Sequence, residues 1–115
     1  MKVLDFLNCK FHDNLLERCK RCTIRLGNKT LEYSENQIVL VTSGDKFLQR
    51  KKLYIAVIDK VFVKQLAQLT ASDCSGEHPT LHTANAVQEF LQKIYGKTVL
   101  PTDIVTVMYF SEVIL

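Results

Sequence analysis

The sequence lacks any apolar run long enough to cross a bilayer, which takes about 20 residues. Asp5, Lys10 and Asp13 interrupt the first apolar stretch, and Asp59 and Lys60 interrupt the central one. The N-terminus also lacks the charged region, apolar core and small-residue cleavage site of a secretion signal. These absences predict a soluble, cytoplasmic protein with no membrane partner.

Motifs that hold a cofactor are also missing. The sequence has no Gly-rich phosphate loop, which argues against a nucleotide triphosphatase. Its four cysteines include one Cys-x-x-Cys pair, Cys19 and Cys22, but no second pair that would close a tetrahedral zinc site. A thiol-redox role would need a helix that starts after the first cysteine, whereas here a predicted helix precedes the pair. We therefore expect free thiols, no metal and no cofactor, with a structural zinc site as the weaker alternative.

The charge is mild overall but unevenly distributed. The chain has 115 residues with 47% hydrophobic content, which suits one domain over residues 1–115. Its net charge is +3, yet residues 1–64 hold 13 Lys and Arg against 7 Asp and Glu, while residues 65–115 hold 2 against 5. A polyanion would therefore meet the first half of the chain, although a solvated protein surface can produce the same imbalance.

The apolar pattern predicts an α+β fold, a small barrel or sheet with helices packed on it. Strands are expected over residues 3–7, 20–26, 38–42, 52–64 and 104–114, the third and fourth forming a hairpin. Helices are expected over residues 10–18, after Thr70 until Pro79, and from Thr83 to Gly96. In the last strand, apolar alternation is expected at Ile104, Val107, Tyr109 and Val113.

Three functional groups meet where the first helix is expected to give way to a strand. Lys20, Thr23 and Arg25 offer an amine, a hydroxyl and a guanidinium, and Thr23 and Arg25 share one face of the strand by its period of two. Lys20 joins that face only if the chain bends. A partly buried lysine beside Arg25 would have its charged form disfavoured, which would make it a general base for a Thr23 nucleophile. Alternatively, these residues are surface strand charges around a β-forming threonine.

The same residues resemble a known family. The segment from Leu15-Leu16 through Arg18 to Arg25 is similar to the helix-to-strand motif of ASCH domains in the PUA-like superfamily of small β-barrels. The small bacterial N4-acetylcytidine amidohydrolases have this order of Lys, two residues, then Thr-Ile-Arg. The resemblance continues, in order, through Leu69-Thr70, Glu77, Ile94-Tyr95-Gly96, Val107 and Phe110.

The resemblance implies an amide hydrolysis on an acetylated cytidine, either as a nucleoside or in RNA. Lys20 would activate Thr23, Thr23 would attack the acetyl carbonyl, and Glu77, expected in a loop, would shuttle a proton. Arg25 would hold developing negative charge, a phosphate or a ribose. Tyr109, or the neighbouring Phe110, would line the base pocket.

The resemblance also implies a non-catalytic alternative. Many ASCH domains have Glu where this chain has Thr23 and are thought to bind RNA or small ligands without hydrolysis. The family's Gly two residues before the Lys is replaced here by Arg18, so a residue with a Cβ must make that turn. An RNA-binding module would contact the backbone through basic residues, for which the candidates are Arg21, Arg50, Lys51 and Lys52.

Overall fold

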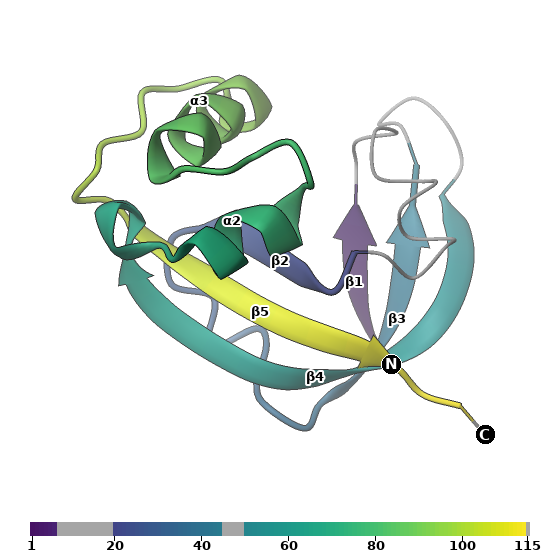
Figure 1. The fold of residues 1–115 in the computed structure, drawn as a ribbon. Coiled ribbons are helices and arrows are strands. Elements are labelled where there is room, and N and C mark those ends of the chain that lie inside the picture. The colour runs from purple at the N-terminus through teal and green to yellow at the C-terminus, as the bar shows by residue number, and fades with distance from the viewer. Residues whose placement is uncertain (7–19, 45–49, 115) are drawn as a thin grey trace.

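The fold is a curled sheet with helices on one face (Figure 1). The computed structural model describes residues 1–6, 20–44 and 50–114. The helix expected over residues 10–18 lies outside these residues. The strands are β1 (Lys2–Phe6), β2 (Cys22–Leu26), β3 (Ile38–Ser43), β4 (Lys51–Gln65) and β5 (Ile104–Glu112). The helices are the 3-10 helix η2 (Leu66–Gln68), α2 (Ala71–Glu77) and α3 (Ala84–Tyr95).

The curl comes from β4, which belongs to both halves of the sheet. The five strands lie in the order β1-β3-β4-β5-β2. The first part of β4 pairs with β3 in the expected antiparallel hairpin, and its later part pairs with β5. A register shift between Ile58 and Lys60 marks an irregularity of the kind that bends and twists a strand. The result is a half-barrel, and the predicted α+β class is confirmed.

Two apolar cores lie on the two faces of this sheet. The inner core contains Leu4, Phe6, Val39, Val41, Tyr54, Ala56, Ile58, Met108 and Phe110. The second core lies between the sheet and helices α2 and α3, and contains Cys22, Ile24, Leu66, Cys74, Val87, Leu91, Val99, Val105 and Val107.

β5 contributes to both cores, which corrects the alternation expected for it. Residues 105–108 are all fully buried, whereas Ile104 is 40% exposed. Side chains that alternate between the faces of a strand are all buried when both faces are covered. The apolar alternation expected at Ile104, Val107, Tyr109 and Val113 was therefore wrong, because residues 105, 106 and 108 between them are buried too.

Side chains connect the two edge strands, β1 and β2. The Arg25 Nη2 atom in β2 donates a hydrogen bond of 2.9 Å to the backbone carbonyl of Asp5 in β1. The Arg25 guanidinium carbon also lies 5.0 Å from the ring centroid of Phe6, the next residue of β1. Arg25 therefore helps to close the half-barrel between β1 and β2.

Helix α2 begins as the sequence predicts and approaches the sheet closely. Thr70 and Asp73 form a reciprocal capping box at its N-terminus. A Cβ on Gly76 would lie 2.7 Å from the Cβ of Cys22, a separation that real Cβ atoms do not show. The absence of a side chain at Gly76 thus allows α2 to pack on β2, and it brings the next residue, Glu77, to the start of that strand.

Within the described ranges 1–6, 20–44 and 50–114, no helix combines the length and apolar character needed to span a membrane.

Candidate functional site

Lys20 lies just before β2 and is almost completely buried. Its side chain turns back so that Nζ donates to the backbone carbonyl of Cys22 at 2.9 Å. Nζ also donates to the Glu77 carboxylate and to the Glu77 backbone carbonyl. Lys20 thus precedes the regular strand. The strand's period of two therefore does not decide in which direction the Lys20 side chain points. Arg18, the position of the family glycine, lies outside the described residues.

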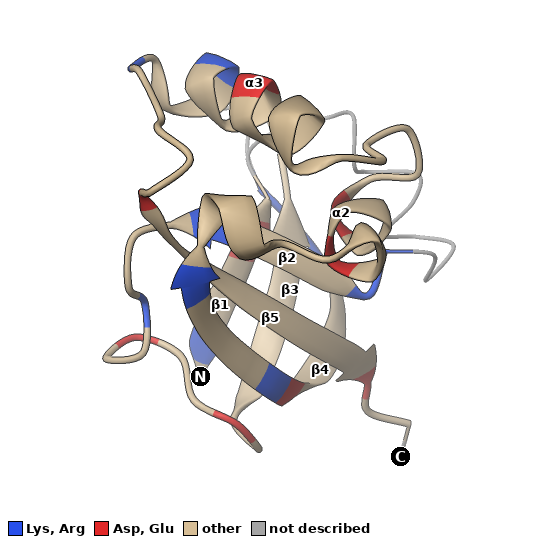
Figure 2. Cartoon of the chain, turned by 60° about the vertical axis from the view of Figure 1, so that its left-hand side comes forward, with Lys and Arg blue, Asp and Glu red and all other residues tan. Residues whose placement is uncertain are grey.

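Glu77 is the last residue of α2, not part of a loop as expected, and it is only 4% exposed. Its carboxylate forms an ion pair with Lys20, 57 positions earlier in the chain. Figure 2 colours the acids of α2 red where the helix lies over the sheet. Both charges lose their hydration at this degree of burial, and their mutual attraction must compensate for that loss. The pair is therefore a specific internal contact and not a surface salt bridge.

Thr23 faces the inner core and is bound by Arg25. Thr23 is 2% exposed and pairs with Met108 of β5. Its Oγ1 atom accepts a hydrogen bond of 3.1 Å from the Arg25 Nε atom. A hydroxyl oxygen that accepts a bond can also donate its own hydrogen, so this contact with Arg25 is compatible with proton donation from Thr23 to a base.

Both cationic side chains lie near the ring of Phe6. The Lys20 Nζ atom lies 5.5 Å from the ring centroid, and the Arg25 guanidinium carbon lies 5.0 Å from it. The Lys20–Glu77 pair and the Arg25–Thr23 pair therefore each have their cation near one aromatic ring. The sequence singled out all four polar residues, but Phe6 resembled an ordinary core residue and carried no signal of this role.

The surroundings of Lys20 shift its titration. Burial lowers the pKa of Lys20, Glu77 and Cys22 oppose this effect, and the charge of Arg25 adds to it, so that the pKa is lower than usual. A lowered pKa makes the neutral amine, which can accept a proton, easier to form. The thiol of Cys22 behaves differently, because burial raises its pKa to about 12 and keeps it protonated and unreactive.

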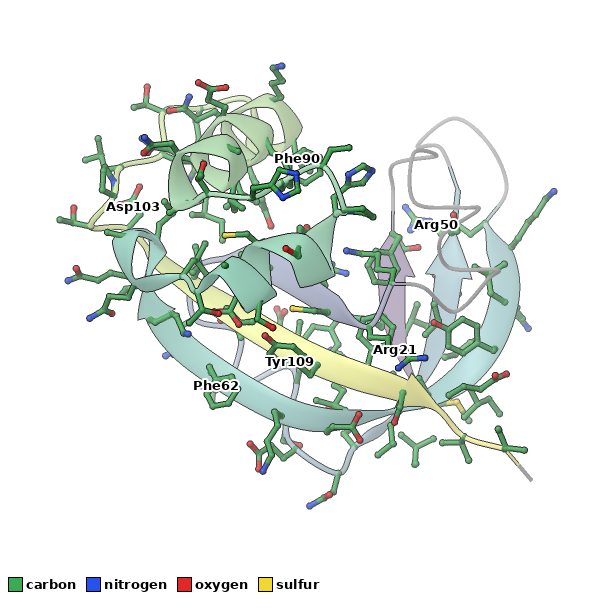
Figure 3. The ribbon with its side chains drawn as sticks, viewed as in Figure 1. Arg21, Arg50, Phe62, Phe90, Asp103 and Tyr109 are labelled. Atoms are coloured by element: carbon green, nitrogen blue, oxygen red, sulfur yellow. The ribbon has the colours of Figure 1, made fainter. Side chains whose placement is uncertain are left out.

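Tyr109 lies on the opposite face of the sheet from Thr23. It pairs with Cys22 in the β2–β5 ladder, so its side chain is on the α2 side, and its hydroxyl donates to the Asp73 carboxylate. Figure 3 shows it near Phe62, whose ring centroid is 6.2 Å from that of Tyr109. The structure therefore does not bring Tyr109 together with Thr23. Phe110, the alternative aromatic, faces the inner core with its ring centroid 6.0 Å from that of Phe6.

The predicted basic residues are exposed, and most lie at one end of the sheet. Phe6 of β1 pairs with Ser43 of β3, and Ser43 pairs on its other side with Lys51 at the start of β4. Lys52 follows it, and both are exposed. Arg50 precedes them and pairs with the carboxylate of Asp5. This end of the sheet is also the end where Phe6 contacts Lys20.

Arg21 is exposed as well, next to the buried Lys20. Its backbone carbonyl accepts a hydrogen bond of 2.9 Å from the Phe110 amide, which extends the β2–β5 ladder by one bond. In the part of the chain that the structure describes, no three His, Cys, Asp or Glu side chains gather in a way that could hold a metal ion.

Comparisons with known proteins identify the fold. No protein-family model and no curated protein sequence matches this chain. An ASCH domain from Lactobacillus crispatus superimposes with a TM-score of 0.65 at 14% identity, over 94% of this chain and 77% of that one. A protein from Enterococcus faecalis of the family DUF984 superimposes with a TM-score of 0.68 at 14% identity, over 98% of this chain and 81% of that one. The chain therefore has the fold of an ASCH domain, as the residues around Lys20 and Thr23 led us to expect.

Proposed function

We propose that this protein hydrolyses the acetyl amide of an acetylated cytidine, with Thr23 as the nucleophile. The observation that carries the proposal is the buried Lys20–Glu77 pair, whose lysine lies near the same Phe6 ring as Arg25, the hydrogen-bond partner of Thr23. A hydroxyl, a lysine of lowered pKa and a carboxylate in contact with that lysine are the parts of an activated nucleophile.

The reaction begins when Glu77 takes a proton from the Lys20 ammonium and leaves a neutral amine. Lys20 then accepts the hydroxyl proton of Thr23 as Oγ1 forms a bond to the acetyl carbonyl carbon. The C–N bond of the tetrahedral intermediate breaks, and the exocyclic nitrogen leaves with the proton from Lys20. Lys20 then takes a proton from water, whose oxygen forms a bond to the acetyl carbon of the Thr23 ester. The C–Oγ1 bond breaks and Lys20 returns the proton to Oγ1. The acetic acid that is released loses its proton to Lys20 and leaves as acetate, while Glu77 gives its proton to solvent.

In this scheme Arg25 does not bind the phosphate or ribose of the substrate. Its guanidinium already donates to Thr23 Oγ1 and to the Asp5 carbonyl. It therefore orients the nucleophile, and its fixed positive charge stabilises the oxyanion electrostatically. The exposed basic residues at the same end of the sheet would meet a phosphate if the nucleoside is part of RNA.

The purified protein is expected to convert N4-acetylcytidine into equimolar cytidine and acetate, which liquid chromatography separates. N4-methylcytidine is the control substrate, because it has a substituent on the same nitrogen but no acyl carbon. An acetylated RNA oligonucleotide, digested to nucleosides after incubation, tests the polymer as substrate. If no acetylated substrate is consumed faster than in buffer alone, the proposal is wrong.

RNA binding without hydrolysis is a second candidate, favoured by the exposure of Lys51 and Lys52 at the same end of the sheet as Phe6. We expect binding of single-stranded RNA that weakens as salt rises from about 50 to 200 mM. Binding releases counterions from the RNA, and this release is less favourable when the salt concentration is high. Charge reversal of both lysines to Glu should reduce the salt slope by about one for each phosphate that the variant no longer neutralises.

The matched control for this experiment is Lys93→Glu with Lys97→Glu, which makes the same charge change at exposed residues in and after α3. Equal losses of RNA affinity in the two double variants would show that only net charge matters, and would count against a binding site near Lys51.

A further inference from the structure

Helix α2 carries a second buried acid, Asp73, which takes no part in the proposed reaction. Asp73 is 3% exposed, and its carboxylate accepts hydrogen bonds from the Tyr109 hydroxyl and from the Lys64 Nζ atom, the latter at 2.9 Å. It also accepts a hydrogen bond of 3.1 Å from the Thr70 amide as part of the helix cap. Tyr109 belongs to β5 and Lys64 to β4, so this single carboxylate ties the start of α2 to two strands.

The end of the same helix carries the site acid. Glu77 follows Asp73 by four residues, so the two side chains lie on one face of a helix only seven residues long. Between them, Gly76 lies against Cys22 of β2. A helix this short contains few internal hydrogen bonds, and its position therefore depends on the contacts at its two ends.

We propose that Tyr109 and Lys64 are positioning residues that act through Asp73 to hold Glu77 against Lys20. The proposal rests on the proposed function for its effect on turnover, but the Lys20–Glu77 contact exists and can be measured whether or not the protein hydrolyses an amide. It also assigns a role to Tyr109, whose side chain lies on the wrong face of the sheet to contact a substrate at Thr23.

The protonation states support this arrangement. Burial alone would raise the pKa of Asp73, but the hydrogen bonds from Tyr109, Lys64 and Thr70 outweigh that effect and lower it. Burial and the neighbouring carboxylate raise the pKa of Tyr109, so its hydroxyl remains a donor. At neutral pH the carboxylate is thus ionised and the Tyr109 hydroxyl can donate to it.

The test is Tyr109→Phe, which removes one hydroxyl and keeps the ring. Loss of the anchor should let Glu77 draw away from Lys20, and the pKa of Lys20 should then fall, because Glu77 no longer opposes the burial effect as strongly. The pKa is read from the NMR shift of the Lys20 side-chain methylene, with Cys22 and Arg25 as the other groups whose charge acts on that amine. In the hydrolysis assay, kcat should fall about tenfold with KM unchanged.

Tyr95→Phe is the matched control, since the Tyr95 hydroxyl accepts a hydrogen bond from the Leu26 amide away from α2. Lys64→Met is the second variant and should also lower the pKa of Lys20. If both variants fold and leave the pKa of Lys20 at the wild-type value, as Tyr95→Phe should, the positioning role is overturned. Failure of the wild-type protein to hydrolyse any substrate would overturn the proposed function but not this inference.

Discussion

Thr23→Val is expected to abolish hydrolysis while the fold persists. Valine has the shape of threonine and an equal tendency to form strands, so β2 should remain paired with β5. The change removes the oxygen that would carry the acetyl group, and removal of a nucleophile lowers kcat by more than about a thousandfold. The missing acceptor for the Arg25 Nε atom should cost about 1 kcal/mol of stability.

Thr23→Ser separates the hydroxyl from the rest of the side chain. Serine keeps both the nucleophilic oxygen and the acceptor for Arg25, so we expect turnover within about a hundredfold of wild type. Mass spectrometry of protein quenched during turnover should find one acetyl group on the peptide that contains residue 23 in the wild type and in the serine variant, and none in the valine variant. Comparable turnover in the valine and serine variants would exclude Thr23 as the nucleophile.

Lys20→Met is expected to destabilise the protein by about 3–5 kcal/mol, because it leaves the carboxylate of Glu77 buried without its charged partner. Glu77→Leu should cost a similar amount for the converse reason. The double variant should be far more stable than the sum of the single effects predicts, since two apolar side chains of similar volume replace a buried ion pair without leaving a charge behind.

Urea unfolding of the four proteins in this double-mutant cycle measures the coupling. Lys97→Met, at an exposed position in the loop after α3, is the control and should change stability by less than about 0.5 kcal/mol. Additive losses in the double variant would mean that Lys20 and Glu77 do not interact in solution, and the site as described would not exist. The double variant should also be inactive, which separates the role of the pair in the reaction from its role in stability.

Most local features of the fold were predictable from the sequence, because each depends on residues close together in the chain. Thr70 and Thr83 cap their helices, and Gly96 ends the second one with a φ of 64° in the left-handed region. The strand pattern also showed correctly that Thr23 and Arg25 share a face, and the two side chains are hydrogen-bonded. Short-range geometry fixes such relations before any tertiary contact forms.

The sequence by itself thus determined the strands, the helix caps and the residue types that gather before and within β2. Only the tertiary structure decided that Glu77 meets Lys20, and that Tyr109 lies on the other face of the sheet from Thr23. The physical reason is that the period of a strand tells which residues share a face but not which element covers it. Both faces of β5 are covered. The hydrophobic pattern of this strand therefore could not tell which of its residues face the inner core with Thr23 and which face α2 with Asp73.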